Sequence, residues 1–194
     1  MTTEPSQARH GATSGQTIVL IGMMGVGKSS VGRRLAASLG LPFLDADAEI
    51  EKAANATIEE IFTTHGEAFF REGERRVIAR LLAGPPHVLA TGGGAFLDPE
   101  TRAAIRTQGV SIWLKATLDL LTARVRRRTN RPLLKKGDPH DILAKLMTER
   151  YPIYEQADLT IEVQEEPIEI TVDRVAATLA DYQKTTSQSK KTPA

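Results

Sequence analysis

The sequence predicts a doubly wound α/β fold in a single domain, with a parallel sheet covered by helices on both faces. Five short runs rich in β-branched and aliphatic residues alternate with longer stretches of helical spacing, and these runs are residues 17–21, 42–44, 87–91, 110–114 and 159–163. The runs are almost entirely apolar, which suits parallel strands that are buried on both faces. A length of 194 residues is typical of one such domain.

Capping and breaking residues predict where several helices begin and end. Thr57, followed three residues later by Glu60, forms a capping box, so a helix should start at residue 58. The next helix is expected from residue 67 to residue 82, because Gly-Pro-Pro at 84–86 cannot continue it. In the last helix one apolar face should cover the sheet, and that face consists of Val172, Val175, Ala176 and Leu179.

Composition narrows the class of protein. Hydrophobic residues make up 41% of the chain and charged residues 25%, as in a globular protein, and the net charge of +1 implies no obligate polyanionic partner. Cysteine is absent, which excludes disulfides and thiolate metal sites, and a reducing cytoplasm is the expected location. No apolar run approaches about 18 residues, so no membrane span is expected.

Polar segments at both ends are expected to be flexible tails around a domain at residues 17–183. Residues 1–16 lack the apolar region of a secretory signal, although a short transit peptide containing Arg9 is an alternative. Residues 184–194 are polar and low in complexity, so order should end near Tyr182.

A phosphate-binding loop is predicted directly after the first strand. Residues 22–29 read Gly-Met-Met-Gly-Val-Gly-Lys-Ser, which fits the pattern Gly, four residues, Gly-Lys-Ser/Thr ahead of a helix. The glycines let N–H groups turn inward, and the helix adds the positive end of its dipole. Lys28 is expected to reach the β- and γ-phosphates of ATP, and Ser29 to ligate Mg²⁺. The predicted nucleotide-binding residues of this loop are Gly25, Val26, Gly27, Lys28, Ser29 and Ser30.

Two carboxylates end the second strand, in the sequence Asp45-Ala46-Asp47. Asp45 is expected to hold a water of the Mg²⁺ shell, and Asp47 to bind acceptor hydroxyls and take a proton during phosphoryl transfer. A structural alternative is that Asp47 only caps a helix over residues 48–54. The residues themselves leave both interpretations open.

Three glycines at 92–94 follow the third strand, at the edge where open α/β sheets bind ligands. Because each glycine costs conformational entropy on ordering, a close approach of the backbone is expected there, with a simple turn as the alternative. Arg71 and Arg150 are candidate ligands for a carboxylate, and Glu74 is spaced to hold Arg71 by an i,i+3 contact. Each arginine taken alone is also typical of a solvated surface.

A basic run over residues 124–131 leads into a predicted loop that reaches residue 139. We interpret residues 125–139 as a mobile lid over ATP, which brings Arg131 onto the transferring phosphate and excludes water. Nucleic-acid contact is the competing interpretation. The near-zero net charge and the absence of interleaved aromatic residues argue against it.

The order of these motifs resembles the shikimate kinase family, over roughly residues 17–182. After the phosphate loop the resemblance is carried by Leu44-Asp45-Ala46-Asp47, Phe70-Arg71-Glu72-Gly73-Glu74, Gly92-Gly93-Gly94-Ala95, Arg131-Pro132-Leu133-Leu134 and Arg150-Tyr151-Pro152-Ile153-Tyr154. It implies the nucleoside-monophosphate-kinase-like P-loop kinase fold, with a five-stranded parallel sheet, helices on both faces and a lid. It also implies a cytoplasmic monomer that phosphorylates the 3-hydroxyl of shikimate with ATP, giving 3-phosphoshikimate and ADP on the route to chorismate and the aromatic amino acids.

The resemblance also implies residue roles. Shikimate is expected to bind through Asp47, Arg71, Gly93 and Arg150, with the arginines on its carboxylate. Nucleotide and metal contacts are expected from Arg124 against the adenine, Arg131 on the phosphates, and Ser29 and Asp45 near Mg²⁺. The expected catalytic residues are Lys28, Asp47 and Arg131. Two alternatives stay open: a gluconate or nucleotide kinase with a different acceptor pocket, and a regulatory nucleotide switch that does not respond to shikimate.

Overall fold

Five parallel strands form one sheet in the order β2-β3-β1-β4-β5, as the sequence predicts. The structure is a computed structural model that describes residues 15–127 and 137–189. The strands are β1 (Thr17–Ile21), β2 (Phe43–Asp45), β3 (Val88–Ala90), β4 (Gly109–Lys115) and β5 (Leu159–Glu162). Each begins and ends within two residues of the predicted run.

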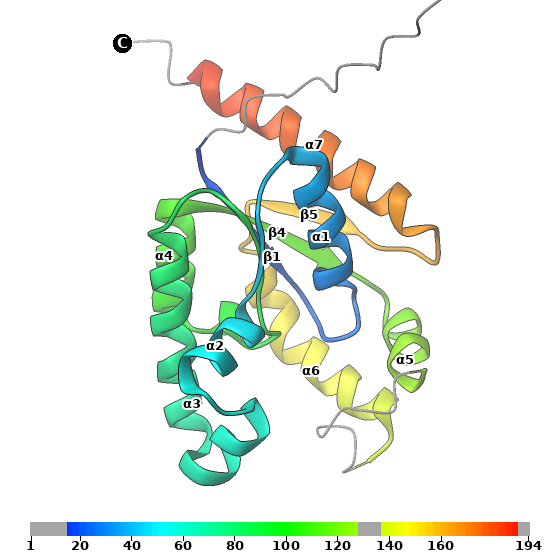
Figure 1. Ribbon diagram of the computed structural model, residues 1–194. Helices are drawn as coiled ribbons and strands as arrows, with labels where there is room; N and C mark the ends of the chain where they lie inside the picture. The colour runs from blue at the N-terminus through cyan, green and yellow to red at the C-terminus, as the bar shows by residue number, and fades with distance from the viewer. Residues whose placement is uncertain (1–14, 128–136, 190–194) are drawn as a thin grey trace, which may run out of the picture.

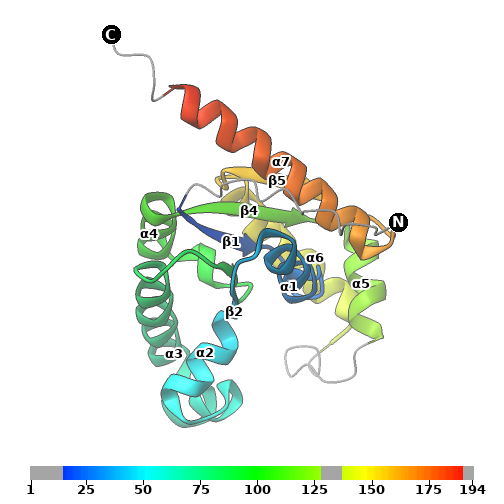
Figure 2. The same cartoon turned by 45° about the horizontal axis from the view of Figure 1, so that its top comes forward.

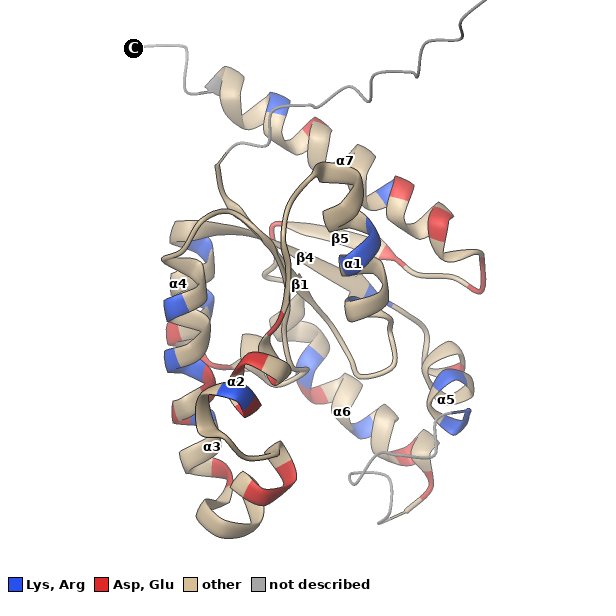
Figure 3. Cartoon of the chain, viewed as in Figure 1, with Lys and Arg blue, Asp and Glu red and all other residues tan. Residues whose placement is uncertain are grey.

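Strand β1 is the centre of the sheet and of the core. It pairs with β3 on one side and with β4 on the other, so Ile18 is level with Val88 and Val110. All five residues of β1 are buried, and neither β1 nor β3 contains a charged residue (Figure 3). The charged side chains belong mainly to the helices, where basic and acidic residues are interspersed. Apolar burial on both faces therefore holds this sheet, as its composition predicts.

Helices cover both faces of the sheet (Figures 1 and 2). Helices α1 and α7 pack together on one face, while α4 and α6 lie on the other. The predicted apolar face of α7 is confirmed, because Val172, Val175 and Leu179 are buried and Ala176 is partly buried against the core. The helices are α1 (Lys28–Leu39), α2 (Ala46–Ala54), α3 (Ile58–Leu82), the 3₁₀ helix η1 (Ala95–Leu97), α4 (Pro99–Gln108), α5 (Leu118–Arg126), α6 (Pro139–Tyr154) and α7 (Ile168–Ser189).

Helix α3 consists of two segments that meet at Gly66. The capping box of Thr57 and Glu60 is present, so the predicted start at Ile58 is confirmed. Gly66 has φ 81° and ψ 175°, a conformation that breaks the helical geometry and that residues with a side chain rarely adopt. The second segment therefore begins at Glu67, which is where the sequence predicts a separate helix.

Two predicted boundaries are wrong. Helix α2 begins at Ala46 and is capped by Asp45, so Asp47 lies in the first turn and is not the N-cap. The chain turns into helix directly after β2, which removes the reason for expecting a cap two residues later. Helix α7 continues to Ser189, past Tyr182, so the expected start of a C-terminal tail at residue 184 falls inside a helix. No helix in the described part of the chain is both long and apolar enough to cross a membrane.

Candidate active site

The candidate active site lies at the carboxyl ends of β1, β2 and β3, which are neighbours in the sheet (Figure 1). The phosphate loop follows β1, Asp45 and Asp47 follow β2, and glycines 92–94 follow β3. A cavity of about 150 Å³ opens among them. Its walls come from all three segments and comprise Met24, Gly25, Gly27, Lys28, Ser29, Ser30, Asp45, Asp47, Thr91, Gly92 and Gly93.

The phosphate loop is shaped by backbone that a side chain would obstruct. Gly22 has φ 138°, and a Cβ at this position would lie 2.6 Å from the Leu114 carbonyl oxygen on β4. Lys28 begins α1 and folds back over the loop, where its Nζ donates to the carbonyl oxygens of Gly22 at 2.8 Å and Met23 at 3.0 Å. The N-terminus of α1 and a cation therefore meet at one wall of the cavity, as an anion site requires.

Asp45 connects the phosphate loop to α2. Its Oδ1 accepts a hydrogen bond from the Asp47 N–H at 3.2 Å, which is the cap of α2. Its Oδ2 accepts from the Ser29 hydroxyl at 2.7 Å. The two side chains predicted to lie near Mg²⁺ are therefore in direct contact at the cavity wall.

Asp47 projects from the first turn of α2 toward the glycines after β3. A Cβ on Gly92 would lie 2.9 Å from Asp47 Oδ1, so the carboxylate rests against the bare backbone. Burial raises the pKa of Asp47 above its ordinary value, and the charge of Asp45 raises it further, while Lys28 and Arg71 oppose the shift. A carboxylate with a raised pKa is a better proton acceptor than an ordinary aspartate.

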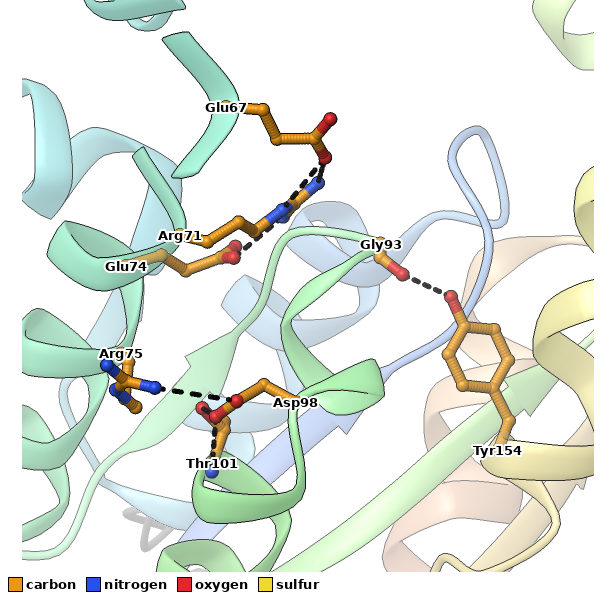
Figure 4. Close-up of polar contacts among 8 residues, drawn as sticks. All are labelled: Glu67, Arg71, Glu74, Arg75, Gly93, Asp98, Thr101 and Tyr154. Atoms are coloured by element: carbon orange, nitrogen blue, oxygen red, sulfur yellow. Dashed lines mark hydrogen bonds and ion pairs between the residues drawn. The ribbon is translucent and has the colours of Figure 1, made fainter. Parts of the chain in front are cut away.

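Arg71 is held by a glutamate on each side (Figure 4). Its Nη1 donates to Glu74 Oε2 at 2.7 Å, and its Nη2 donates to Glu67 Oε1 at 3.2 Å. The predicted contact with Glu74 is thus confirmed. The Glu74 side chain is only 4% exposed, whereas that of Glu67 is 68% exposed. Burial raises the pKa of Glu74, with Arg71 opposing the shift.

Glycines 92–94 lie where three candidate side chains and Glu74 converge. None of the three glycines has a positive φ angle, so their backbone conformation does not require glycine. The close approach of neighbouring side chains to this backbone is the reason that a Cβ is not accommodated. A Cβ on Gly92 would meet Asp47 and Glu74, one on Gly93 would lie 3.1 Å from Arg150 Nη1, and one on Gly94 would lie 2.5 Å from Arg71 Nη1. The prediction that backbone approaches something closely here is confirmed. The four candidate residues for the acceptor are thus gathered around one loop.

Tyr154, four residues after Arg150, has no role that its sequence context predicts. Tyr154 is fully buried, and its hydroxyl donates a hydrogen bond to the Gly93 carbonyl oxygen (Figure 4). Arg150 lies one turn earlier on α6, and its Nε is buried with no hydrogen-bond partner among the described residues. Spacing of i,i+4 on a helix was the available signal, because it places both side chains on one face.

A second cavity of about 380 Å³ adjoins the first beyond the phosphate loop, and Gly25, Gly27 and Ser30 line both. Its other walls are Val26, Val31, Arg124, Arg127, Val163, Glu166, Ile168 and Thr171. Arg124 crosses its edge, donating to the carbonyl oxygens of Val26 at 2.9 Å and Gln164 at 3.2 Å. The wall between β5 and α7 carries no recognisable motif and is not predicted from the sequence. Arg131, the third predicted catalytic residue, lies outside the described residues.

Comparison with known proteins decides between the kinases that share this fold. Residues 24–180 match the sequence model of the family described as shikimate kinase. The chain belongs to the shikimate kinase family. Its fold is accordingly the P-loop kinase fold that the motifs imply, and it phosphorylates shikimate with ATP as co-substrate in the shikimate pathway.

Relatives named as shikimate kinases match most of the chain. One from Paramagnetospirillum magneticum is 59% identical over 87% of this chain and 86% of its own length. Another, from Rhodopseudomonas palustris, is 58% identical over 92% of this chain and 88% of its own length. A solved shikimate kinase from Acinetobacter baumannii, in complex with shikimate, is 36% identical with a TM-score of 0.82, covering 91% of this chain and 98% of that one.

Proposed function

We propose that this shikimate kinase transfers the γ-phosphoryl group of ATP in line to the 3-hydroxyl of a shikimate molecule held by Asp47, Arg71, Gly93 and Arg150. The observation that carries the proposal is the convergence at glycines 92–94. One carboxylate and two guanidinium groups approach the same short loop, beside the cavity that Lys28 lines. A small acceptor with ring hydroxyls and one carboxylate matches that combination of charges.

Asp47 is the proposed proton acceptor. As the shikimate oxygen bonds to the γ-phosphorus, the bond from that phosphorus to the β–γ bridging oxygen breaks and ADP leaves, and the hydroxyl proton passes to Asp47. The raised pKa of Asp47 suits this step. Lys28 adds a positive charge near the phosphate oxygens, where negative charge shifts during transfer.

The same site fits Mg²⁺. Ser29 and Asp45 present a hydroxyl and a carboxylate that are in contact, and oxygen atoms are the ligands that Mg²⁺ takes. Within residues 15–127 and 137–189 no cluster of three or more His, Cys, Asp or Glu side chains is arranged to hold a metal ion. A small number of protein ligands is normal for a Mg²⁺ site, because the ion keeps several waters and phosphate oxygens in its coordination shell. When bound, the ion would neutralise part of the charge on the phosphates.

The nucleotide is proposed to extend from this cavity into the larger one. Arg124 lies at the edge of the larger cavity, in reach of an adenine, while Gly25, Val26, Gly27 and Ser30 line the path to the phosphates. We further propose that Arg131, within a lid at residues 125–139, contacts the phosphates. A cytoplasmic monomer without nucleic-acid or membrane partners remains our expectation for the whole chain.

A coupled ADP-release assay tests the reaction against shikimate, gluconate and nucleoside monophosphates. Only shikimate should stimulate ADP release, and stimulation by either other acceptor would contradict the proposal. Arg71→Ala should raise the KM for shikimate while leaving the KM for ATP unchanged. Arg150→Lys should do the same, because lysine cannot reproduce a bidentate fork. An unchanged KM for shikimate in either variant would remove that arginine from the site.

A further inference from the structure

Tyr154 is a buried tyrosine that contacts the proposed shikimate site without having a place in the reaction described above. It is the last residue of α6 and is 0% exposed. Its phenolic hydroxyl reaches across to the loop after β3 and donates to the Gly93 carbonyl oxygen (Figure 4). A fully buried hydroxyl therefore ties the helix that carries Arg150 to the loop that carries Gly93.

The ring of Tyr154 is fixed by its aromatic neighbours. Its centroid lies 5.9 Å from that of Trp113 on β4 and 6.2 Å from that of Tyr151. Tyr151 meets Trp113 edge-on at 4.9 Å, and its own hydroxyl donates to the Ala116 carbonyl oxygen at 2.6 Å. The two tyrosines thus share one aromatic wall and one kind of hydrogen bond, but only Tyr154 bonds to the glycine loop.

The bond to Tyr154 fixes how the peptide between Gly93 and Gly94 faces. This peptide is trans, and a trans peptide is planar, so directing its carbonyl at Tyr154 directs the Gly94 N–H the opposite way. The N–H groups of Gly93 and Gly94 donate to no acceptor in the described part of the chain. Three consecutive glycines have no side chains to limit their backbone. The bond to Tyr154 therefore sets the direction of the Gly94 N–H, whereas the Gly93 N–H belongs to the preceding peptide.

We propose that Tyr154 is a positioning residue for shikimate, which acts by anchoring the Gly93 carbonyl and so holding the peptide between Gly93 and Gly94 in one orientation at the proposed carboxylate site. The inference rests on the proposed function, because it takes Gly93 and Arg150 to be part of the shikimate site. Tyr154 itself does not touch the substrate. Its effect is on the affinity for shikimate, since a loop already held in place loses less entropy when the substrate binds.

The protonation state of Tyr154 agrees with its role as a donor. Burial raises the pKa of the phenol above its ordinary value, and the charge of Arg150 opposes the shift. The hydroxyl consequently keeps its proton throughout the neutral range. A carbonyl oxygen accepts hydrogen bonds only, so it requires a protonated phenol as its partner.

The test compares Tyr154→Phe with Tyr151→Phe. Each variant loses a phenolic hydrogen bond to a main-chain carbonyl and keeps its ring against Trp113, and Tyr154→Phe loses in addition the polar contact of its hydroxyl with the Arg150 side chain. The stability lost in a thermal melt should therefore be similar or slightly larger for Tyr154→Phe. Tyr154→Phe should raise the KM for shikimate about three- to tenfold, the effect of one hydrogen bond, with the KM for ATP unchanged. Tyr151→Phe should leave both constants unchanged. Isothermal titration calorimetry measures shikimate binding directly, and the Kd should follow the KM.

Thermal melts with and without saturating shikimate provide a second measurement, which remains usable if a variant is destabilised. The increase in Tm caused by shikimate should be smaller for Tyr154→Phe than for Tyr151→Phe. Equal increases and equal Kd values in the two variants would show that Tyr154 is merely structural. A rise in the KM for both substrates would likewise overturn the inference, because it would indicate a general perturbation.

Arg150→Lys distinguishes this failure from a failure of the proposed site. If Arg150→Lys weakens shikimate binding while Tyr154→Phe behaves like Tyr151→Phe, the site stands and the role of Tyr154 is rejected. If Arg150→Lys leaves shikimate binding unchanged, the proposed carboxylate site is itself wrong, and the inference fails with it.

Discussion

Ser29 donates a hydrogen bond to Asp45 across 2.7 Å, and this contact joins the phosphate loop to the start of α2. We expect Ser29→Ala to raise the Mg²⁺ concentration needed for half-maximal activity, because it removes one of the two proposed oxygen ligands of the ion. Asp45→Ala should do the same and also lower the free energy of unfolding by about 1 kcal/mol, since Asp45 caps α2. Titration of activity with Mg²⁺, alongside chemical denaturation, measures both effects.

Thr57→Ala is the control for the loss of a cap. Thr57 caps α3 with its side chain exposed to solvent and contacts neither cavity. Thr57→Ala should lower the free energy of unfolding by about as much as Asp45→Ala and leave the Mg²⁺ requirement unchanged. If Thr57→Ala also altered the Mg²⁺ requirement, the effect of Asp45→Ala would reflect stability alone.

Asp47→Asn should reduce kcat by orders of magnitude while making the protein more stable at neutral pH. Because burial raises the pKa of Asp47 above its ordinary 3.8, protonation favours the folded state. The protonated Asp47 therefore adds to the free energy of unfolding in full below pH 3.8, and this addition is lost as pH rises through the raised pKa of the folded state. Asparagine cannot ionise, so Asp47→Asn should have the higher Tm above this window. Near-normal kcat would exclude Asp47 as the proton acceptor.

The pH profile of the unaltered protein provides an independent check on Asp47. In the proposed mechanism the ionised carboxylate of Asp47 accepts the proton, so kcat/KM for shikimate should fall as pH decreases through the raised pKa of Asp47. The decline should therefore occur at higher pH than for an aspartate with the ordinary value of 3.8. A profile that stays flat down to that value would contradict the assignment.

Glu74→Gln should raise the KM for shikimate more than Glu67→Gln. Both glutamates contact Arg71, but the Glu74 side chain is 4% exposed and that of Glu67 is 68% exposed. An exposed ion pair contributes little, typically under about 1 kcal/mol, whereas a buried partner fixes the guanidinium. Steady-state kinetics on the two variants make the comparison, and equal effects would show that burial of Glu74 does not matter for Arg71.

Gly94→Ala should weaken shikimate binding, because the new methyl group would lie 2.5 Å from Arg71 Nη1. Gly73→Ala is the matched control, since its Cβ would meet nothing within 4 Å and Gly73 lies in a helical part of α3. It should increase stability by about 0.5–1 kcal/mol and leave the KM for shikimate unchanged. Binding titrations and melts on both variants test the contrast, which a normal affinity in Gly94→Ala would contradict.

Arg124→Ala should raise the KM for ATP and leave that for shikimate unchanged, because Arg124 borders only the larger cavity. Arg34→Ala is the control, since Arg34 makes an exposed ion pair with Glu169 at 3.3 Å. It should affect neither constant. Loss of shikimate affinity in Arg124→Ala would argue against separate sites for nucleotide and acceptor.

The sequence predicted those parts of the fold and site that depend on local chemistry. The five apolar strands, the capping box at Thr57 and the contact between Arg71 and Glu74 all follow from spacing along the chain. The phosphate loop followed from its glycines, one of which would collide with β4 if it had a side chain.

Features that depend on contacts between distant segments were not predictable in the same way. Tyr154 reaches Gly93 only because α6 and the loop after β3 are brought together by the sheet order. Asp45 caps α2 because the strand turns into helix without a connecting residue, which the pattern of side chains did not show. The wall between β5 and α7 has no motif, so only the fold places it beside Arg124.

In the proposed arrangement, the order β2-β3-β1-β4-β5 gives the two substrates different sides of the molecule. The proposed acceptor site uses the segments that follow β2 and β3 together with Arg150 on α6, whereas the proposed nucleotide cavity lies among the phosphate loop, α5 and the connection from β5 to α7. Substitutions on one side can thus accumulate with little effect on the other. Helix α6 is different, because it packs against both α5 and η1. A substitution in α6 that alters nucleotide binding should therefore also alter acceptor binding. For that reason the sequence of α6 should diverge more slowly than those of the other helices.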